Sequence, residues 1–212
     1  MAPTDWVFPP PDPELATVRI VRTIGAEDDL RLESPRGEGL VSFKTEDLIS
    51  EQERNTHAQF AWRRGPAWTR GIMVLHHEEY FVVRLAWGRL LVFDLAEPRL
   101  RSPLPSPADE KETTKPHGPQ EVSDEVLEEI LLAFDALALA NLSSEQAEER
   151  RIAVTVCAAR NLTEATPQLQ KIARRDPGHH FVSTSAEKSR KVYFVREAAK
   201  EALRELEKTD GK

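Results

Sequence analysis

The strongest constraint on the fold lies near the C-terminal end, where apolar residues recur at helical spacing in three successive segments. In segment 147–158 small apolar residues, including Cys157, share one face, and the charged run Glu148–Arg151, with Arg150 in it, is predicted to lie outside. A similar stripe runs from Val195 to Leu206. Because Ala and Cys let two helices approach closely, this part of the chain is expected to form packed helices.

The ends of these segments carry helix-capping signals. Ser143 and Gln146 have the spacing of a capping box ahead of the first segment. Thr166 is predicted to cap the second segment, with Pro167 at its first position, where a missing N–H is tolerated. Asp176-Pro177-Gly178 is predicted to end it, after basic residues that suit the negative end of a helix dipole: Lys171, Arg174 and Arg175.

The order of these segments resembles a known helical repeat. The string Thr166–Ala173, then Asp176, then Val195–Leu203, is similar to the second helix of one HEAT repeat followed by the first helix of the next. In that family an Asp between repeats and an Arg after the Val tend to form a polar ladder, so the resemblance implies these roles for Asp176 and Arg196. It covers about residues 123–208. An ordinary antiparallel helical bundle has the same periodicity and remains the alternative.

The sequence departs from the HEAT pattern at one join. The family places only a few residues between the two helices, whereas residues 177–194 intervene here. Either this stretch is an inserted loop, or the repeat assignment is wrong at this join.

The first half of the chain has a different pattern, which predicts antiparallel strands. Thr17–Ile24 alternates apolar and polar residues, and Tyr80–Ala86 is dense in strand-forming residues. Trp87-Gly88-Arg89 then supplies a tight hairpin turn before Leu90–Leu95, and Thr45–Glu53 is predicted to be one short helix. The fold class is therefore α+β, an N-terminal antiparallel β-rich domain followed by a C-terminal HEAT-like α-helical domain.

Proline-rich stretches mark the predicted boundaries. Residues 1–16 are expected to form an extended proline-rich arm that lays Trp6, Val7 and Phe8 on the surface of the β-rich domain. A second proline-rich, charged stretch is expected to be a linker. The predicted organisation is an arm at 1–16, a β-rich domain at 17–104, a linker at 105–122 and a helical domain at 123–208.

Composition limits the compartment and the class of partner. The 212 residues carry a formal net charge of −7, which makes nucleic acid an unlikely partner. The single cysteine, Cys157, excludes a disulfide within the chain and suits a reducing compartment. No apolar run approaches the roughly 20 residues of a membrane span. The N-terminus lacks the basic stretch with which a signal peptide begins, so no signal peptide is predicted. We therefore expect a cytoplasmic protein that does not bind a membrane.

Two clusters are candidate binding residues. The first interleaves aromatic and basic side chains, as binding hot spots do, and its members are Trp62, Arg63, Arg64, Trp68 and Arg70. The alternative is that its two tryptophans close the sheet core while the arginines extend to solvent. The second lies in and beside the inserted loop and would contact an acidic partner or a phosphate; its members are Arg174, Arg175, His179, His180 and Arg190. A solvated loop is the alternative for this cluster.

Evidence for an enzyme is weaker. On a strand, His77 and Glu79 would share a face and could provide two ligands of a metal site. The sequence does not indicate a third ligand. His57 is the only candidate nearby, and its spacing from His77 matches no metal-binding pattern. A solvated hairpin turn at His76–Glu79 is the favoured interpretation, and no metal or cofactor is predicted. The sequence contains no glycine-rich phosphate loop and no nucleophile elbow.

The function predicted from the sequence is therefore non-enzymatic: an adaptor that uses a short helical-repeat surface to hold another protein. One alternative is a small acidic protein that neutralises a basic, toxin-like partner. The other is an enzyme or enzyme subunit, such as a HEAT-like lyase or a metal-dependent hydrolase, since some HEAT-like proteins act as lyases on bound pigments.

Overall fold

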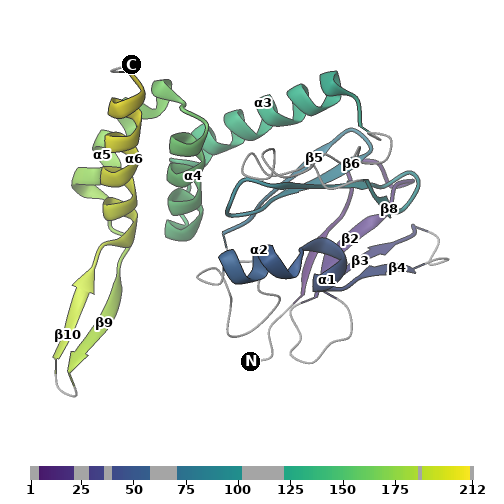
Figure 1. The fold of residues 1–212 in the computed structure, drawn as a ribbon, viewed down its shortest axis with the longest axis horizontal. Helices are drawn as coiled ribbons and strands as arrows, with labels where there is room; N and C mark the ends of the chain where they lie inside the picture. The colour runs from purple at the N-terminus through teal and green to yellow at the C-terminus, as the bar shows by residue number, and fades with distance from the viewer. Residues whose placement is uncertain are drawn as a thin grey trace. The chain divides into compact units, whose positions relative to one another are not determined.

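The strands lie in the N-terminal half of the chain and the long helices in the C-terminal half (Figure 1), which confirms the predicted α+β class. The structure is a computed structural model that describes residues 5–21, 29–35, 40–57, 71–101, 122–185 and 188–210. Two compact units are present, residues 1–127 and 128–212. Within the described ranges, none of the helices combines the length and apolar character needed to cross a membrane.

The first sheet is an antiparallel meander of β1 (Trp6–Phe8), β2 (Thr17–Ile20), β3 (Leu30–Glu33) and β4 (Leu40–Phe43). Alternate residues of β2 and β3 are fully buried, while Arg19 and Glu33 pair on the other face, with Nε and Oε1 2.7 Å apart. The N-terminal arm differs from the prediction. Trp6, Val7 and Phe8 were expected on the surface of the β-rich domain. They instead form a strand of its first sheet, paired with β2 so that Trp6 lies opposite Ile20.

The second sheet is also an antiparallel meander, formed by β5 (Met73–His77), β6 (Tyr80–Arg84), β7 (Leu90–Asp94) and β8 (Arg99–Leu100). Glu78 adopts a φ of 51° in the turn between β5 and β6. Gly88 adopts a φ of 97° in the predicted turn between β6 and β7, a conformation that glycine accepts without strain. Every residue of β7 is buried, which is consistent with its apolar run Leu90–Phe93; the last residue, Asp94, is buried with Arg101 as its ion-pair partner.

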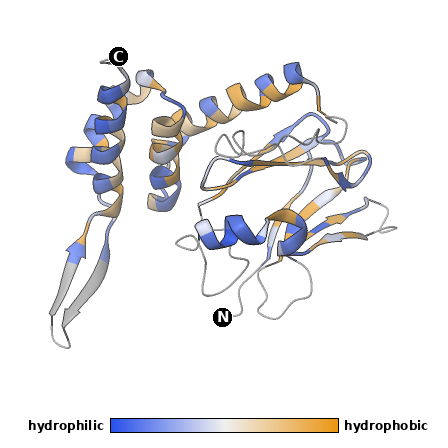
Figure 2. Ribbon diagram, in the orientation of Figure 1, coloured by the Kyte–Doolittle hydropathy of each residue, from blue (hydrophilic) through white to orange (hydrophobic). Residues whose placement is uncertain are grey.

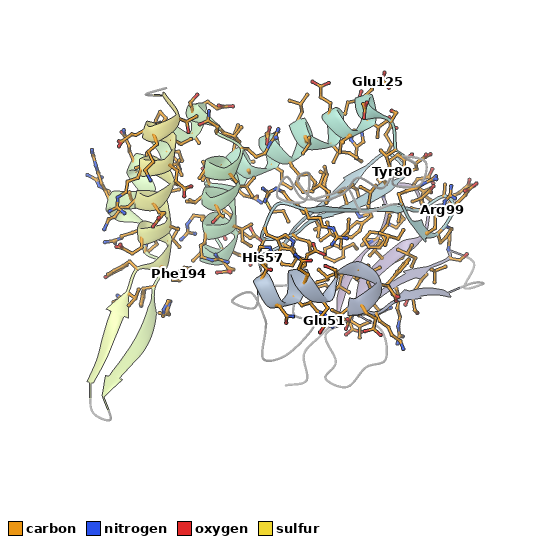
Figure 3. All side chains as sticks on the ribbon, viewed as in Figure 1. Glu51, His57, Tyr80, Arg99, Glu125 and Phe194 are labelled. Atoms are coloured by element: carbon orange, nitrogen blue, oxygen red, sulfur yellow. The ribbon has the colours of Figure 1, made fainter. Side chains whose placement is uncertain are left out.

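The core of the first unit joins the two sheets (Figure 3). Phe8 of the first sheet packs on Phe81 of the second, with ring centroids 5.2 Å apart, and Phe43 packs on Phe93 at 5.5 Å. The backbone N–H of Ala16 donates to the carbonyl of Leu95 at 3.0 Å and ties the sheets together at that point.

The single helix expected at residues 45–53 is two short helices, α1 (Thr45–Leu48) and α2 (Glu51–Thr56). The break has two causes. Ile49 is extended and buried with Leu48 in the core, and Ser50 starts α2 with a capping box. In that box the N–H of Glu53 donates to Ser50 Oγ at 3.2 Å, and the N–H of Ser50 donates to Glu53 Oε2 at 3.0 Å.

The second unit contains most of α3 (Asp124–Asn141), followed by α4 (Ala147–Ala159), α5 (Thr166–Arg175) and α6 (Phe194–Asp210), with a short 3₁₀ turn, η4 (Thr163–Ala165), before α5. α6 packs against both α4 and α5. Hydrophilic and apolar residues alternate along α6 in Figure 2. Its buried stripe repeats every three or four residues: Val195, Ala199, Ala202 and Leu206.

Two predicted caps are wrong. α4 begins at Ala147, and Gln146 stands at its cap position without a side-chain cap. Ser144, not Ser143, makes the local bonds: its Oγ accepts from the N–H of Gln146 at 3.1 Å and donates to a carboxylate oxygen of Glu149 at 2.5 Å. Thr166 is the first helical residue of α5 rather than its cap, because the 3₁₀ turn before it already has helical backbone angles.

The stretch predicted as an inserted loop contains a β-hairpin, which is a correction to the sequence analysis. β9 (His180–Ser185) and β10 (Lys188–Val192) pair antiparallel, with His180 opposite Val192 at the base and a register shift between Lys188 and Ser189. Figure 1 shows this hairpin extending beyond the ends of α5 and α6. The sequence signal is weak because serine and lysine interrupt the strand-forming residues.

Candidate binding site at the base of the hairpin

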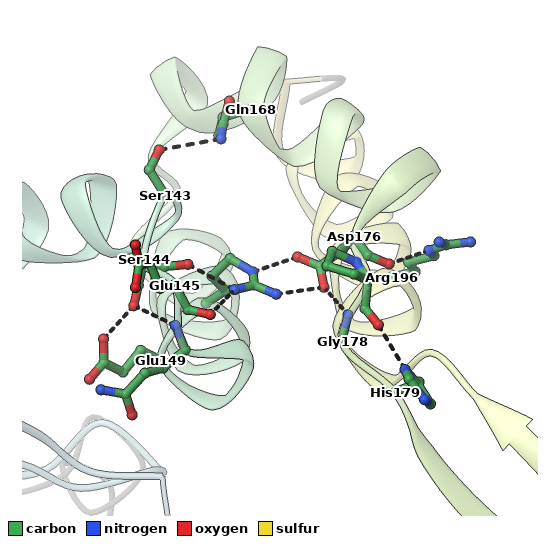
Figure 4. A network of polar contacts seen from close by, with 12 residues as sticks. Ser143, Ser144, Glu145, Glu149, Gln168, Asp176, Gly178, His179 and Arg196 are labelled. Atoms are coloured by element: carbon green, nitrogen blue, oxygen red, sulfur yellow. Dashed lines mark hydrogen bonds and ion pairs between the residues drawn. The ribbon is translucent and has the colours of Figure 1, made fainter.

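The hairpin is attached to the helices through a buried ion pair (Figure 4). Asp176 ends α5, and its carboxylate accepts two hydrogen bonds from Arg150 of α4, from Nε at 2.5 Å and from Nη2 at 3.0 Å. The remaining nitrogen, Nη1, donates to the carbonyls of Ser144 and Glu145 at 2.8 and 2.9 Å. This guanidinium therefore holds together the start of α4 and the end of α5.

The burial of Arg150 contradicts the sequence analysis, which placed it outside. The residue is only 8% exposed. A signal was present, because Arg150 lies three, four and seven residues before buried positions of α4 and so shares their face. Its charge argued for an exposed position, and its partner Asp176 is 26 residues away in sequence, too far for any local pattern to reveal.

Arg196, at the start of α6, also contacts Asp176. Its Nε donates to the backbone carbonyl of Asp176 at 2.6 Å, while the carboxylate is taken by Arg150. The two residues that the HEAT resemblance singled out therefore meet, through the main chain of one of them. The HEAT assignment itself stays a prediction.

Asp176 is held in its ionised form. Burial alone would raise the pKa of Asp176. The hydrogen bonds from Arg150 and from the N–H of Gly178, with the positive charges of Arg150 and Arg196, outweigh that effect and keep the pKa below its ordinary value of 3.8. At neutral pH this ion pair therefore has both charges and all its hydrogen bonds in place.

Gly178 fits the space between the helices and the hairpin only because it has no side chain. A Cβ at this position would lie 2.7 Å from the Cβ of Ala147, 2.8 Å from Cγ2 of Val195 and 2.9 Å from Oδ1 of Asp176. Each distance is shorter than a normal van der Waals contact. The chain consequently leaves α5 in close contact with both neighbouring helices.

Aromatic and basic side chains surround the hairpin base. The guanidinium carbon of Arg196 lies 3.9 Å from the ring centroid of Tyr193, and Lys191 Nζ lies 5.2 Å from the same centroid. His179 packs near this ring at 5.7 Å, with Nδ1 2.9 Å from the carbonyl of Pro177. His180 packs near Phe194 at 5.4 Å.

The site is strongly basic within an acidic protein. Residues 166–192, which contain α5 and both strands of the hairpin, have six lysines and arginines against two acidic residues, a formal net charge of +4, whereas the whole chain carries −7. One of those two acids is Asp176, which is already neutralised by Arg150. The predicted second cluster falls here: Arg174, Arg175, His179 and His180 are exposed, and Arg190 lies in β10.

The predicted first cluster cannot be placed in the same way. Trp62, Arg63, Arg64, Trp68 and Arg70 lie outside the described residues. The described residues do contain a link between α2 and the β6–β7 turn that the sequence did not predict. There Glu53 pairs with the largely buried Arg89, Trp87 Nε1 donates to Glu53 at 3.3 Å, and His57 stacks on Trp87 at 4.7 Å.

The histidines at the β5–β6 turn do not build a metal site in the described part of the chain. Glu78 and Glu79 are exposed in the turn, but His76 and His77 belong to β5 and the ring nitrogens of His76 are buried, so the predicted solvated turn is wrong for its first two residues. Because the chain reverses at Glu78, His77 and Glu79 do not share a strand face. In the described ranges no three His, Cys, Asp or Glu residues come close enough to hold a metal ion.

Cys157 lies in the helical core, as predicted. Burial, with smaller contributions from the charges of Glu164 and Asp135, raises the pKa of the Cys157 thiol to about 12. The thiol is therefore protonated at neutral pH and acts as a small core side chain rather than as a nucleophile.

Comparison with protein-family models, curated proteins and solved structures finds no match to this chain.

Proposed function

We propose that this chain is a non-enzymatic adaptor that holds an acidic partner protein through the β9–β10 hairpin and the basic end of α5. The observation that carries the proposal is the basic hairpin inserted between two packed helices. Its base is held by the buried pair of Arg150 and Asp176. In this proposal α4, α5 and α6 form a short helical-repeat surface that presents the hairpin.

A fixed hairpin base supports binding because less conformational entropy is lost when the partner binds. An interface element already held in place loses less freedom when a partner arrives than a mobile loop does. Arg150, Asp176 and Gly178 connect the start of β9 to α4 and α5, and Arg196 connects it to α6. The hairpin is therefore pre-organised where it leaves the helices.

The charge of the site selects the kind of partner. A net charge of +4 over residues 166–192 attracts an acidic surface and accelerates its encounter. The same charge repels a basic partner at this site, so the hairpin favours an acidic partner over the basic, toxin-like partner considered from the sequence.

A charge-reversal experiment tests the proposal. The full chain, tagged, is purified from the cells that make it, and co-purifying proteins are quantified by mass spectrometry. The test variant carries Arg174→Glu, Arg175→Glu, Arg190→Glu and Lys191→Glu. The control reverses two charges, Arg204→Glu and Lys208→Glu, at exposed positions that begin about 15 Å from the start of α6, given a rise of about 1.5 Å per residue.

We expect the unmodified chain and the control to recover an acidic protein in near-equal molar amount, and the test variant to recover about tenfold less. Circular dichroism of all three proteins checks that the helices remain. Equal recovery by the test variant and the control would refute the proposal. Recovery of no stoichiometric protein by the unmodified chain would refute it as well.

A further inference from the structure

The hairpin has two outer edges, and the edge of β9 is open. β9 pairs with β10 along one side, and within the ranges that the structure describes no strand pairs with its other side. The outward N–H and C=O groups of such an edge are a template for another strand. The six residues of β9 offer an edge of about 20 Å.

The two strands differ in how well their composition protects them. β10 contains Lys188, Arg190 and Lys191, and charged residues of this kind discourage pairing at a sheet edge. β9, with the sequence His-Phe-Val-Ser-Thr-Ser, contains no lysine, arginine, aspartate or glutamate, and it is richer in strand-forming residues. The unprotected edge is therefore that of β9.

From these observations we infer that β9 binds an extended acidic segment of a partner protein as a third strand of the hairpin. The inference rests on the proposed function and specifies its mode of binding. Isolated two-stranded ribbons are marginally stable, and a third strand pairs groups that are otherwise left to solvent. The attachment of Asp176 and Gly178 to the helices positions β9 before the partner arrives.

Charge identifies the occupant as an acidic protein segment rather than a second copy of this chain. Pairing of β9 with β9 of another copy would bring together two segments that each carry +4 over residues 166–192. An acidic strand beside β9 instead brings negative charge to this net-positive segment. A nucleic acid satisfies the charge but lacks the alternating N–H and C=O groups that a strand edge pairs with.

The first probe is a capped peptide of about twelve alternating Glu and Val residues, about twice the length of β9. Its control has the same sequence with four consecutive central residues N-methylated, which removes donors from both edges without changing the charge. Binding to the full-length chain is measured by calorimetry. Amide hydrogen exchange with mass spectrometry follows β9, with α4 as the internal reference.

We expect the unmethylated peptide to bind at concentrations below about 1 mM and to slow amide exchange in β9 but not in α4. The methylated peptide should bind at least about tenfold more weakly. Equal affinity for both peptides, or binding without slower exchange in β9, would mean charge attraction alone and would overturn the inference. Absence of binding would overturn it too.

Two proline variants test the edge from the protein side. Successive N–H groups of a strand point to opposite edges, so of Val182→Pro and Ser183→Pro only one removes a donor from the β9–β10 ladder. The variant that retains slow exchange in β10 should lose peptide binding although its charge is unchanged. If that variant binds the peptide normally, the edge of β9 is not used.

The remaining outcomes separate the possible occupants and the two proposals. Dimers at about 10 μM, with β9 protected in the absence of peptide, would assign the edge to a second copy and overturn the acidic partner. Tighter binding of heparin or of a single-stranded oligonucleotide than of the peptide would overturn it as well. If charge reversal abolishes recovery of a partner but that partner leaves β9 exchange unchanged, the proposed function stands and strand addition fails.

Discussion

Asp176 joins three parts of the helical unit through its side chain and its main chain. Its carboxylate is nearly inaccessible to solvent and accepts from Arg150 and from the N–H of Gly178, and its carbonyl accepts from Arg196. A buried ion pair adds little stability compared with a well-packed apolar pair, but removing one partner leaves an uncompensated buried charge. Loss of the carboxylate, which leaves the buried Arg150 without a counter-charge, therefore costs more stability than the ion pair itself adds.

The Asp176→Asn substitution should destabilise the helical unit by about 3 kcal/mol, because the Arg150 guanidinium stays buried without a counter-charge. The matched control is Asp135→Asn, which breaks the more exposed pair with Arg160 and should cost less than about 1 kcal/mol. Urea unfolding at pH 7, followed by circular dichroism, measures both. Equal effects of the two substitutions would show that burial of the Asp176 pair has no energetic weight.

The same substitution should change the acid limb of the stability curve. The pKa of Asp176 is lower in the folded state than its ordinary value of 3.8, so its contribution is complete above that pH and is lost as the pH falls through the folded-state value. Unfolding free energy between pH 5 and about pH 2 should therefore decline less steeply in Asp176→Asn than in the unmodified chain. Parallel curves would contradict the assignment.

His76 should make the first unit sensitive to mild acid. Its two ring nitrogens are buried and accept or donate no hydrogen bond in the described part of the structure, and burial lowers the pKa of His76 below 6.5. The folded state therefore resists protonation. Stability should be complete above about pH 6.5 and should fall as the pH drops through the folded-state pKa, because the unfolded chain binds the proton more tightly.

The measurement for His76 is the urea midpoint of the β-rich unit between pH 8 and pH 5, followed by tryptophan fluorescence. His76→Leu, which preserves the packing against Phe81, should make the urea midpoint depend less on pH. His180→Leu, at an exposed position, should leave that dependence unchanged. An unchanged pH dependence in His76→Leu would show that another group accounts for the acid sensitivity.

Among the elements, the hairpin strands differ from α4, α5 and α6 in what they pack against. β9 and β10 pack on each other, whereas α6 packs on both α4 and α5. The stability of the helical unit should therefore depend on the hairpin base and little on the strands. This separation distinguishes the part that folds the unit from the part that we propose to bind a partner.

Replacing residues 181–191 by Asn-Gly tests that separation, since His180 and Val192 face each other and Asn-Gly closes a two-residue turn. We expect the unfolding free energy to change by less than about 1 kcal/mol, with the helical signal intact. The acidic partner and the alternating Glu-Val peptide should no longer bind. A loss of several kcal/mol would show that the strands support the helical core.

At the scale of the whole molecule, the sequence predicts the broad plan because each half has its own period. Alternation along β2 and β3 and the three-to-four spacing in α6 are local patterns, and they separate a β-rich half from a helical one. The predicted strands at Tyr80 and Leu90 correspond to β6 and β7 because both segments are dense in strand-forming residues, although neither alternates.

The features that the sequence could not predict depend on partners far apart in the chain or on competing local signals. Arg150 meets Asp176 across 26 residues, and Glu53 meets Arg89 across 36. The break between α1 and α2 arises because Ile49 is drawn into the core and Ser50 caps the second helix. The basic character of the hairpin base is evident from the sequence. The pairing of β9 with β10 is not, because the sequence does not show that His180 lies opposite Val192.

That register also means that the chain leaves the helical unit and returns to it at a single place. A segment whose two ends are neighbours can be lengthened, shortened or exchanged without rerouting the helices on either side. The contacts of Arg150, Asp176 and Gly178 at the hairpin base would then hold hairpins of different sequence at the same position. Related chains could keep the helices and vary the ribbon, and a designer could graft a different recognition strand at the same point.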